Sequence, residues 1–222
     1  MPPQLPPKLS RAPILYLITS GETRATTTEQ SPEFERLLGL CAAAVSSGIS
    51  LIQLREKNLS ARVLFELTTR AARLTRGSQT RLVVNDRADV ARAGGADGVH
   101  LTTRSLDAGT VRRAFGQDFL IGVSTHTLSE AEAARRGGAD FATFGPIFDT
   151  PSKRAFGPPV GLAPLSEAAR SLAPFPLLAL GGITTSENAT EALAAGAQGI
   201  ASIRLFSNAS ALQAIAQSLR LP

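Results

Sequence analysis

Gly138-Ala139-Asp140-Phe141 is the stretch that decides the fold, because the chain repeats its pattern. Gly95-Ala96-Asp97-Gly98 and Gly196-Ala197-Gln198-Gly199 also place a glycine and an alanine directly before a short apolar run. Each copy follows a helical pattern, and its first glycine is suited to the left-handed conformation that ends a helix. The repeat therefore predicts helix-to-strand turns of one kind.

Outward from these turns, strand patterns and helix patterns alternate along the chain. The predicted strands are short apolar runs at 14–19, 51–55, 81–84, 98–101, 119–123, 141–144, 177–180 and 199–203. The predicted helices cover 32–47, 61–76, 88–93, 106–115, 129–136, 162–172, 186–195 and 209–219. Such alternation requires a parallel sheet, and eight units close a barrel. A doubly wound open sheet is the alternative, but no glycine fingerprint follows the first strand.

We therefore predict an α/β protein, a single-domain (β/α)8 TIM barrel of eight parallel strands. The barrel domain is expected over residues 14–222, after a disordered or extended N-terminal tail over residues 1–13. The length of 222 residues and the 43% apolar content are sufficient for one large core.

Composition and charge narrow the class of ligand and the compartment. The net charge of +5 permits an anionic ligand, whereas the 5% aromatic content and the lack of a dense Lys/Arg run argue against nucleic acid. No run approaches about 18 apolar residues, so no membrane span is predicted. The proline-rich start does not resemble a signal peptide, and Cys41 is the sole cysteine, predicted to be buried and inert. We expect a cytoplasmic protein, and a homo-oligomer is compatible with the sequence.

The strand-to-helix loops lie on the face where barrels of this kind carry their chemistry. After the second predicted strand, Gln53, Arg55 and Lys57 share a face if the strand persists that far, and they suit a diphosphate. In the alternative interpretation, Glu56 and Lys57 are ordinary loop charges. After the third, Asn85-Asp86 suits magnesium and phosphate, although this pair also makes turns and helix caps.

The next strand ends carry histidines and hydroxyls. His100 lies within the fourth predicted strand, and we interpret it as a structural barrel residue. After the fifth, Ser124 and Thr125 suit an anion, while His126 is either a proton carrier or a polar loop residue.

The remaining loops complete two predicted anion-binding corners. Phe144 to Arg154 carries Thr150, Ser152 and Lys153, and Gly181-Gly182 exposes backbone N–H groups to an anion. Ile203-Arg204 adds a cation after the eighth strand. Strands two, three and five would form a diphosphate corner, and strands seven and eight a monophosphate corner, which the loop after strand six would bridge.

Several motifs in this order resemble thiamine phosphate synthase and its thiazole tautomerase relatives. The segments that carry the resemblance are 53–57, 85–87, 98–101, 122–126, 145–146 with 150–153, and 181–183, and it covers about residues 14–206. It implies a barrel that joins hydroxymethylpyrimidine diphosphate to a thiazole phosphate, or its carboxylated form. The products would be thiamine phosphate and pyrophosphate.

The resemblance also implies roles for particular residues, with Mg²⁺ as cofactor and small phosphorylated molecules as substrates. The residues that would hold the pyrimidine diphosphate are Gln53, Arg55, Lys57, Asn85 and Lys153. Asp86 would bind magnesium, and Ser124 would assist the departing diphosphate together with Lys153. The residues that would hold the thiazole phosphate are Thr150, Ser152 and Gly182, with Ile203 and Arg204 beside them. The implied mechanism is dissociative: magnesium and cationic side chains stabilise the leaving pyrophosphate, and the thiazole nitrogen captures the pyrimidine-methyl cation. It requires no nucleophilic side chain.

Two departures from the family pattern leave alternatives open. Ser105 stands where the synthases usually carry a second magnesium-binding Asp, and Ile203-Arg204 replaces the usual Val-Ser. Both departures favour the tautomerase branch, in which His126 would carry the proton. The complete set of diphosphate residues favours the synthase, which we rank first. A third interpretation is a catalytically silent barrel that binds a thiamine precursor and regulates a partner.

Overall fold

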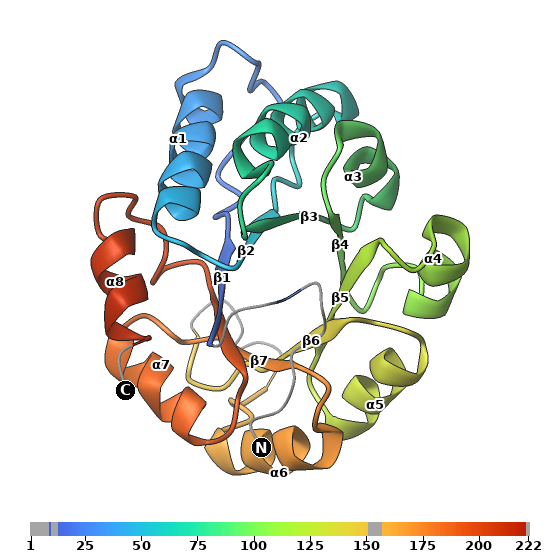
Figure 1. Cartoon of the computed structure of the whole chain (residues 1–222), viewed down its shortest axis with the longest axis vertical. Helices are drawn as coiled ribbons and strands as arrows, with labels where there is room; N and C mark the ends of the chain where they lie inside the picture. The colour runs from blue at the N-terminus through green and yellow to red at the C-terminus, as the bar shows by residue number, and fades with distance from the viewer. Residues whose placement is uncertain (1–8, 10–12, 151–156, 221–222) are drawn as a thin grey trace.

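Eight parallel strands close into one barrel in their order along the chain, and helices alternate with them around the outside (Figure 1). This is a computed structural model, and it describes residue 9, residues 13–150 and residues 157–220. The strands are β1 (Ile14–Ile18), β2 (Leu51–Leu54), β3 (Arg81–Asn85), β4 (Gly98–Leu101), β5 (Leu120–Thr125), β6 (Phe141–Phe144), β7 (Leu177–Leu180) and β8 (Gly199–Ser202). The helices are α1 (Pro32–Ser46), α2 (Ala61–Thr75), α3 (Ala88–Gly94), α4 (Ala108–Phe115), α5 (Leu128–Arg136), α6 (Leu162–Leu172), α7 (Ser186–Ala194) and α8 (Leu212–Ser218). The predicted (β/α)8 barrel is confirmed.

Some predicted element ends are wrong in ways that matter for function. Strand β2 ends at Leu54, so it does not persist to Lys57, which is exposed in the following turn. Strands β3 and β5 instead run further than predicted, so Asn85 and Ser124 belong to strands rather than to loops. A side chain on a strand has a direction fixed by alternation, which a loop residue lacks.

The repeated turns lock each new strand to the preceding one at the amino-terminal end of the barrel. Asp97 accepts a hydrogen bond from the backbone N–H of Leu82 at 2.8 Å, and Asp140 accepts one from that of Ile121 at 2.7 Å. In the third copy the side chain of Gln198 does the same for Leu177 at 2.8 Å. The glycines at 95, 138 and 196 all have positive φ, as predicted for left-handed helix caps. The polar residue of the repeat is therefore an anchor between neighbouring strands.

Arg112 of α4 reinforces one of these turns from the outside. Its guanidinium lies 2.7 Å from the carboxylate of Asp140 and donates to the carbonyls of Phe119 and Gly138 at 2.6 and 2.8 Å. The two charged side chains are only 10% and 14% exposed. Because both ends of this pair also satisfy backbone groups, removing one partner would leave a poorly solvated charge.

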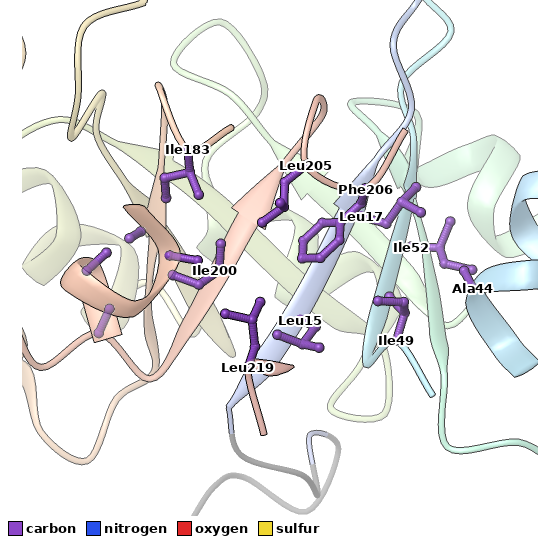
Figure 2. Packing of buried hydrophobic residues seen from close by; sticks show 14 of the residues in the cluster. Leu15, Leu17, Ala44, Ile49, Ile52, Ile183, Ile200, Leu205, Phe206 and Leu219 are labelled. Atoms are coloured by element: carbon purple, nitrogen blue, oxygen red, sulfur yellow. The ribbon is translucent and has the colours of Figure 1, made fainter. Parts of the chain in front are cut away.

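Alternation along the strands separates two apolar layers. Tyr16 and Phe141 point into the barrel and belong to an interior cluster, whose members are Leu9, Ile14, Tyr16, Ile18, Leu51, Val83, Leu120, Phe141, Leu178 and Ala201. Leu15 and Leu17 of β1 point the other way and pack with Ile200 and with Phe206 beyond β8 (Figure 2). This outer layer attaches the helices to the sheet.

The remaining predictions about the core can now be assessed. Cys41 lies fully buried on α1, and burial raises the pKa of its thiol to about 12, so the predicted inert thiol is confirmed. Leu9 is buried in the interior cluster, while the rest of the predicted tail up to residue 12 lies outside the described residues. Over the described part of the chain, no helix has the length and apolar character needed to cross a bilayer.

Candidate active site at the carboxyl ends of the strands

Polar side chains replace apolar ones where the barrel interior opens at the carboxyl ends of the strands, which we call the mouth. Gln53, Asn85 and Thr143 stand two residues beyond Leu51, Val83 and Phe141 of the interior cluster, and Ser124 stands four beyond Leu120, so they share the inward strand faces. His100 of β4 contacts the same cluster through Tyr16 and Phe141. These mouth residues are Gln53, Asn85, His100, Ser124 and Thr143. The strand register thus brings together residues that the sequence separates widely.

His100 occupies the centre of this polar layer. Its side chain is 2% exposed, and its ring centroid lies 5.6 Å from that of Tyr16 and 5.8 Å from that of Phe141. Nε2 lies 2.9 Å from the Oγ of Ser124. Burial lowers the pKa of His100 to about 3, so the imidazole is neutral at physiological pH. His100 is a barrel residue, as predicted, but the sequence did not indicate its contact with Ser124.

Gln53 is held by a second buried contact. Its Nε2 donates to the hydroxyl of Tyr16 at 2.6 Å, and both side chains are buried. Burial raises the pKa of the Tyr16 phenol above its ordinary value, with Gln53 opposing this as a hydrogen-bond donor, so the phenol stays neutral. Arg55 is half-buried beyond the end of β2, and its guanidinium passes over Gly21, where an added Cβ would lie 3.1 Å from Nη1.

Glu56 is the main structural residue that the sequence reasoning missed. It is 3% exposed, not an ordinary loop charge. Its carboxylate accepts from the backbone N–H of Gly21 at 3.2 Å and from the N–H and hydroxyl of Thr23 at 3.3 and 2.7 Å. It therefore holds the loop that follows β1, which borders the mouth.

Asp86 lies directly beyond β3 with an unusual backbone conformation. Its φ is 63°, and its N–H donates to the carbonyl of His100 at 2.9 Å, while its side chain is exposed. Ser105, which the resemblance aligns with a second magnesium-binding Asp, accepts from the N–H of Thr102 at 2.7 Å and closes a local turn. Over the described residues no group of three or more His, Cys, Asp or Glu side chains could hold a metal.

The segment after β5 contains one wrong prediction. Thr125 is buried, and its hydroxyl donates to the carbonyl of Thr143 at 2.9 Å, so it is not available to an anion. His126 is exposed, and its Nδ1 lies 2.5 Å from the carbonyl of Gly145. Because a carbonyl only accepts, Nδ1 carries the proton and Nε2 is left for exchange with a ligand.

The loop after β6 is attached to the glycine turn after β7. The N–H groups of Ile147 and Phe148 donate to the carbonyls of Leu180 and Gly181 at 2.9 and 3.1 Å. Gly181 and Gly182 have φ of 98° and 70°, and a Cβ on Gly182 would lie 2.5 Å from that of Phe148. The predicted proximity of these two loops is confirmed. Thr150 is half-buried and donates to the carbonyl of Phe148 at 3.1 Å, whereas Ser152 and Lys153 lie outside the described residues.

Ser202, which the sequence reasoning also passed over, joins the turns after β7 and β8. Its buried hydroxyl donates to the carbonyl of Ile183 at 2.8 Å and accepts from the N–H of Leu205 at 3.1 Å. Ile203 packs against the interior cluster, whereas Arg204 is exposed. Ile203 and Glu56 both line a cavity of about 320 Å³ beside the loop after β1.

The fold and the position of the polar layer define the class: a (β/α)8 barrel with its chemistry at the carboxyl ends of the strands. Comparison with known families matches residues 15–206 to the family described as thiamine monophosphate synthase. A putative thiamine-phosphate synthase of Geobacter sulfurreducens is 48% identical over 75% of this chain and 78% of that protein. The thiamine-phosphate synthase of Roseiflexus castenholzii is 42% identical over 86% of this chain and 79% of that protein.

A solved structure agrees with these relatives. The thiamine phosphate pyrophosphorylase from Pyrococcus furiosus superposes with a TM-score of 0.75 at 29% identity, covering 96% of this chain and 98% of that chain. The chain belongs to the thiamine monophosphate synthase family. It is an enzyme of thiamine biosynthesis and a transferase of the pyrimidine group.

Proposed function

We propose that this chain joins 4-amino-2-methyl-5-hydroxymethylpyrimidine diphosphate to 4-methyl-5-(2-phosphoethyl)thiazole, or its carboxylated form, giving thiamine phosphate and pyrophosphate. The observation that carries the proposal is the polar layer at the mouth, where Gln53, Asn85 and Ser124 extend from β2, β3 and β5, with His100 of β4 between the last two. Family membership supports the same reaction.

In this proposal the diphosphate lies over strands β2, β3 and β5. The residues that hold it are Gln53, Arg55, Lys57, Asn85 and Lys153. Gln53 is restrained by Tyr16 at 2.6 Å, so its amide needs little further ordering when the substrate binds. Arg55 is half-buried, which strengthens the attraction between its charge and an anion relative to full exposure in water.

Magnesium fits the donors present, provided that the substrate supplies most of its ligands. Mg²⁺ typically retains waters and uses one or two carboxylates together with substrate phosphates. Asp86 provides one exposed carboxylate, and Ser105 provides a hydroxyl rather than a second charge. When bound, the ion would neutralise charge on the leaving diphosphate.

Ser124 and Lys153 are the residues proposed to act during bond cleavage. Ser124 lies on β5 with its hydroxyl next to His100, and it would donate to a diphosphate oxygen as negative charge develops there. Lys153 would neutralise the same oxygens. The thiazole nitrogen then captures the pyrimidine-methyl cation, so no side chain serves as a nucleophile.

The thiazole phosphate would bind between the loops after β6, β7 and β8. The proposed contacts are Thr150, Ser152, Gly182, Ile203 and Arg204. The left-handed turn at Gly182 favours this arrangement, because successive N–H groups in such turns converge on an anion. Ile203 would contact the ring, since it packs at the edge of the interior cluster.

The tautomerase alternative assigns proton transfer to Nε2 of His126, the nitrogen that Gly145 leaves uncommitted. The curated relatives reported above carry the synthase name, and they favour the synthase over both the tautomerase and the silent regulator. We further propose that the protein works in the cytoplasm on these small phosphorylated substrates. A homo-oligomer stays a prediction.

The decisive experiment follows pyrophosphate release when both substrates and Mg²⁺ are mixed. We expect turnover by the wild type, a loss of at least about a hundredfold in kcat for Ser124→Ala, and nearly unchanged synthase turnover for His126→Ala. Thr69→Ala is a matched hydroxyl control, because the half-buried Thr69 lies on α2 and its hydroxyl donates to the carbonyl of Phe65 in the same helix. Absence of pyrophosphate above background would overturn the synthase. Proton exchange on the thiazole that His126→Ala abolishes would favour the tautomerase instead.

A further inference from the structure

One buried nitrogen of the mouth has no conventional hydrogen-bond partner. Among the described residues, Nδ1 of His100 is fully buried without any such partner, while Nε2 lies 2.9 Å from Ser124 Oγ. The imidazole is buried between the rings of Tyr16 and Phe141, where a charged ring would be poorly solvated, so the ring is neutral and only one of its two nitrogens carries a hydrogen. The surroundings of Nδ1 decide which nitrogen that is.

Gly122 of β5 faces Nδ1. A Cβ built on Gly122 would lie 2.7 Å from Nδ1, so a Cα hydrogen of this glycine points toward that nitrogen. A lone pair on Nδ1 accepts such a C–H contact weakly. A hydrogen on Nδ1 would instead face another hydrogen and would be a buried donor without an acceptor, which costs about 1–3 kcal/mol.

The favoured tautomer therefore carries its hydrogen on Nε2. Nε2–H then donates to Ser124 Oγ, which becomes the acceptor in this contact. The hydroxyl hydrogen of Ser124 is consequently not directed at His100 and can point elsewhere. Ser124 is only partly buried, so its hydroxyl is accessible from the mouth.

We propose that His100 is a positioning residue: it donates from Nε2 to Ser124 and thereby directs the Ser124 hydroxyl hydrogen toward the anionic leaving group. This inference rests on the proposed function, because it needs the diphosphate to lie over β5. The contact also polarises the hydroxyl, since an oxygen that accepts a hydrogen bond becomes a stronger donor. Gly122 is part of the same arrangement, because any larger residue would collide with His100 and Phe141.

Two amide substitutions form a matched test. In His100→Gln the side-chain nitrogen can reach the place of Nε2 and still donate to Ser124. In His100→Asn the shorter amide reaches only the place of Nδ1, so polarity is kept but the donor to Ser124 is lost. We expect His100→Asn to lower kcat at least about tenfold with little change in KM for the pyrimidine diphosphate, and His100→Gln to restore most of it. Equal activity of the two variants would overturn the proposal.

A double substitution tests whether His100 acts through Ser124. His100→Asn combined with Ser124→Ala should be no slower than Ser124→Ala alone, because His100 acts through the Ser124 hydroxyl, which is already absent. Independent, multiplicative losses would mean that His100 acts by another route, and would overturn the inference. Thermal melts of all variants separate this effect from lost stability.

The tautomer of His100 can also be determined by NMR, without an activity measurement. The chain has two histidines, so long-range proton–nitrogen NMR of histidine-labelled protein gives two ring patterns, and the His100→Gln spectrum assigns them. We expect His100 to carry hydrogen on Nε2 alone, and a hydrogen on Nδ1 would overturn the inference. A wild type with the expected tautomer but no pyrophosphate release refutes the proposed function, and with it the role of Ser124 in it. An active wild type with the other tautomer refutes only the role of His100.

Discussion

Glu56 provides the sharpest test of how the mouth is held together. Its carboxylate accepts three of the hydrogen bonds that attach Gly21 and Thr23 to the segment after β2, and Nδ2 of Asn58 donates one more to the carbonyl of Thr23. Glu56→Gln keeps the shape but turns one acceptor into a donor that faces an N–H group. Hydrogen bonds to charged groups contribute about 1.5–3 kcal/mol each, and the neutral amide is cheaper to bury, so we expect a net loss of about 2 kcal/mol.

A graded series makes this estimate testable. Thr23→Ala removes one donor and should cost about 1 kcal/mol, whereas Glu56→Ala leaves all the donors without acceptors and should cost about 3–4 kcal/mol. A domain of this kind has about 5–15 kcal/mol of stability, so every variant should still fold. Urea denaturation measures the free energy of unfolding, and hydrogen exchange at Gly21 and Thr23 reports opening of the loop.

The functional consequence follows from the cavity of about 320 Å³ that Glu56 shares with Ile18 and Ile203. A loosened loop should raise KM more than it lowers kcat, because the substrate must order the loop on binding. If the free energy of unfolding of Glu56→Gln is within about 0.5 kcal/mol of the wild-type value and hydrogen exchange at Gly21 is unchanged, the carboxylate does not anchor the loop. That result would refute the reasoning.

Three further outcomes are expected. Asp86→Asn should raise the Mg²⁺ concentration needed for half-maximal activity by roughly tenfold, and an unchanged Mg²⁺ requirement would contradict the ligand assignment. Stability should not change, because Asn tolerates the positive φ of 63° at this position. Gly182→Ala should lower the melting temperature and weaken thiazole phosphate binding, because the added Cβ would lie 2.5 Å from that of Phe148. Gly39→Ala is the matched control that should not destabilise the protein, because a Cβ added there has no atom of another residue within 4 Å. Arg112→Met should cost about 3–5 kcal/mol in urea denaturation while kcat of the folded fraction is unchanged; a loss below about 1 kcal/mol would contradict the buried ion pair.

The sequence by itself determined the architecture of this protein. The repeated turns ending in Asp97, Asp140 and Gln198 mark where β4, β6 and β8 begin, and local patterns along the rest of the chain predict the other strands and the helices. These signals are local, because helix caps and apolar runs involve residues that are close in the chain. The resemblance to the family rested on short motifs, most of them at the opposite, carboxyl ends of the strands.

Only the tertiary structure decided which side chains work together. Ser124 meets His100 across 24 positions of sequence, Thr23 meets Glu56 across 33, and Ser202 meets Ile183 across 19. Each pair depends on strand register and on where a strand ends. An error of one residue in either would move a side chain from the inside of the barrel to the outside. For this reason Ser124 was predicted as a loop donor, Thr125 was wrongly given the same role, and Glu56 was considered only in the alternative interpretation, as an ordinary loop charge. Closure of the barrel is what turns these separate residues into one site.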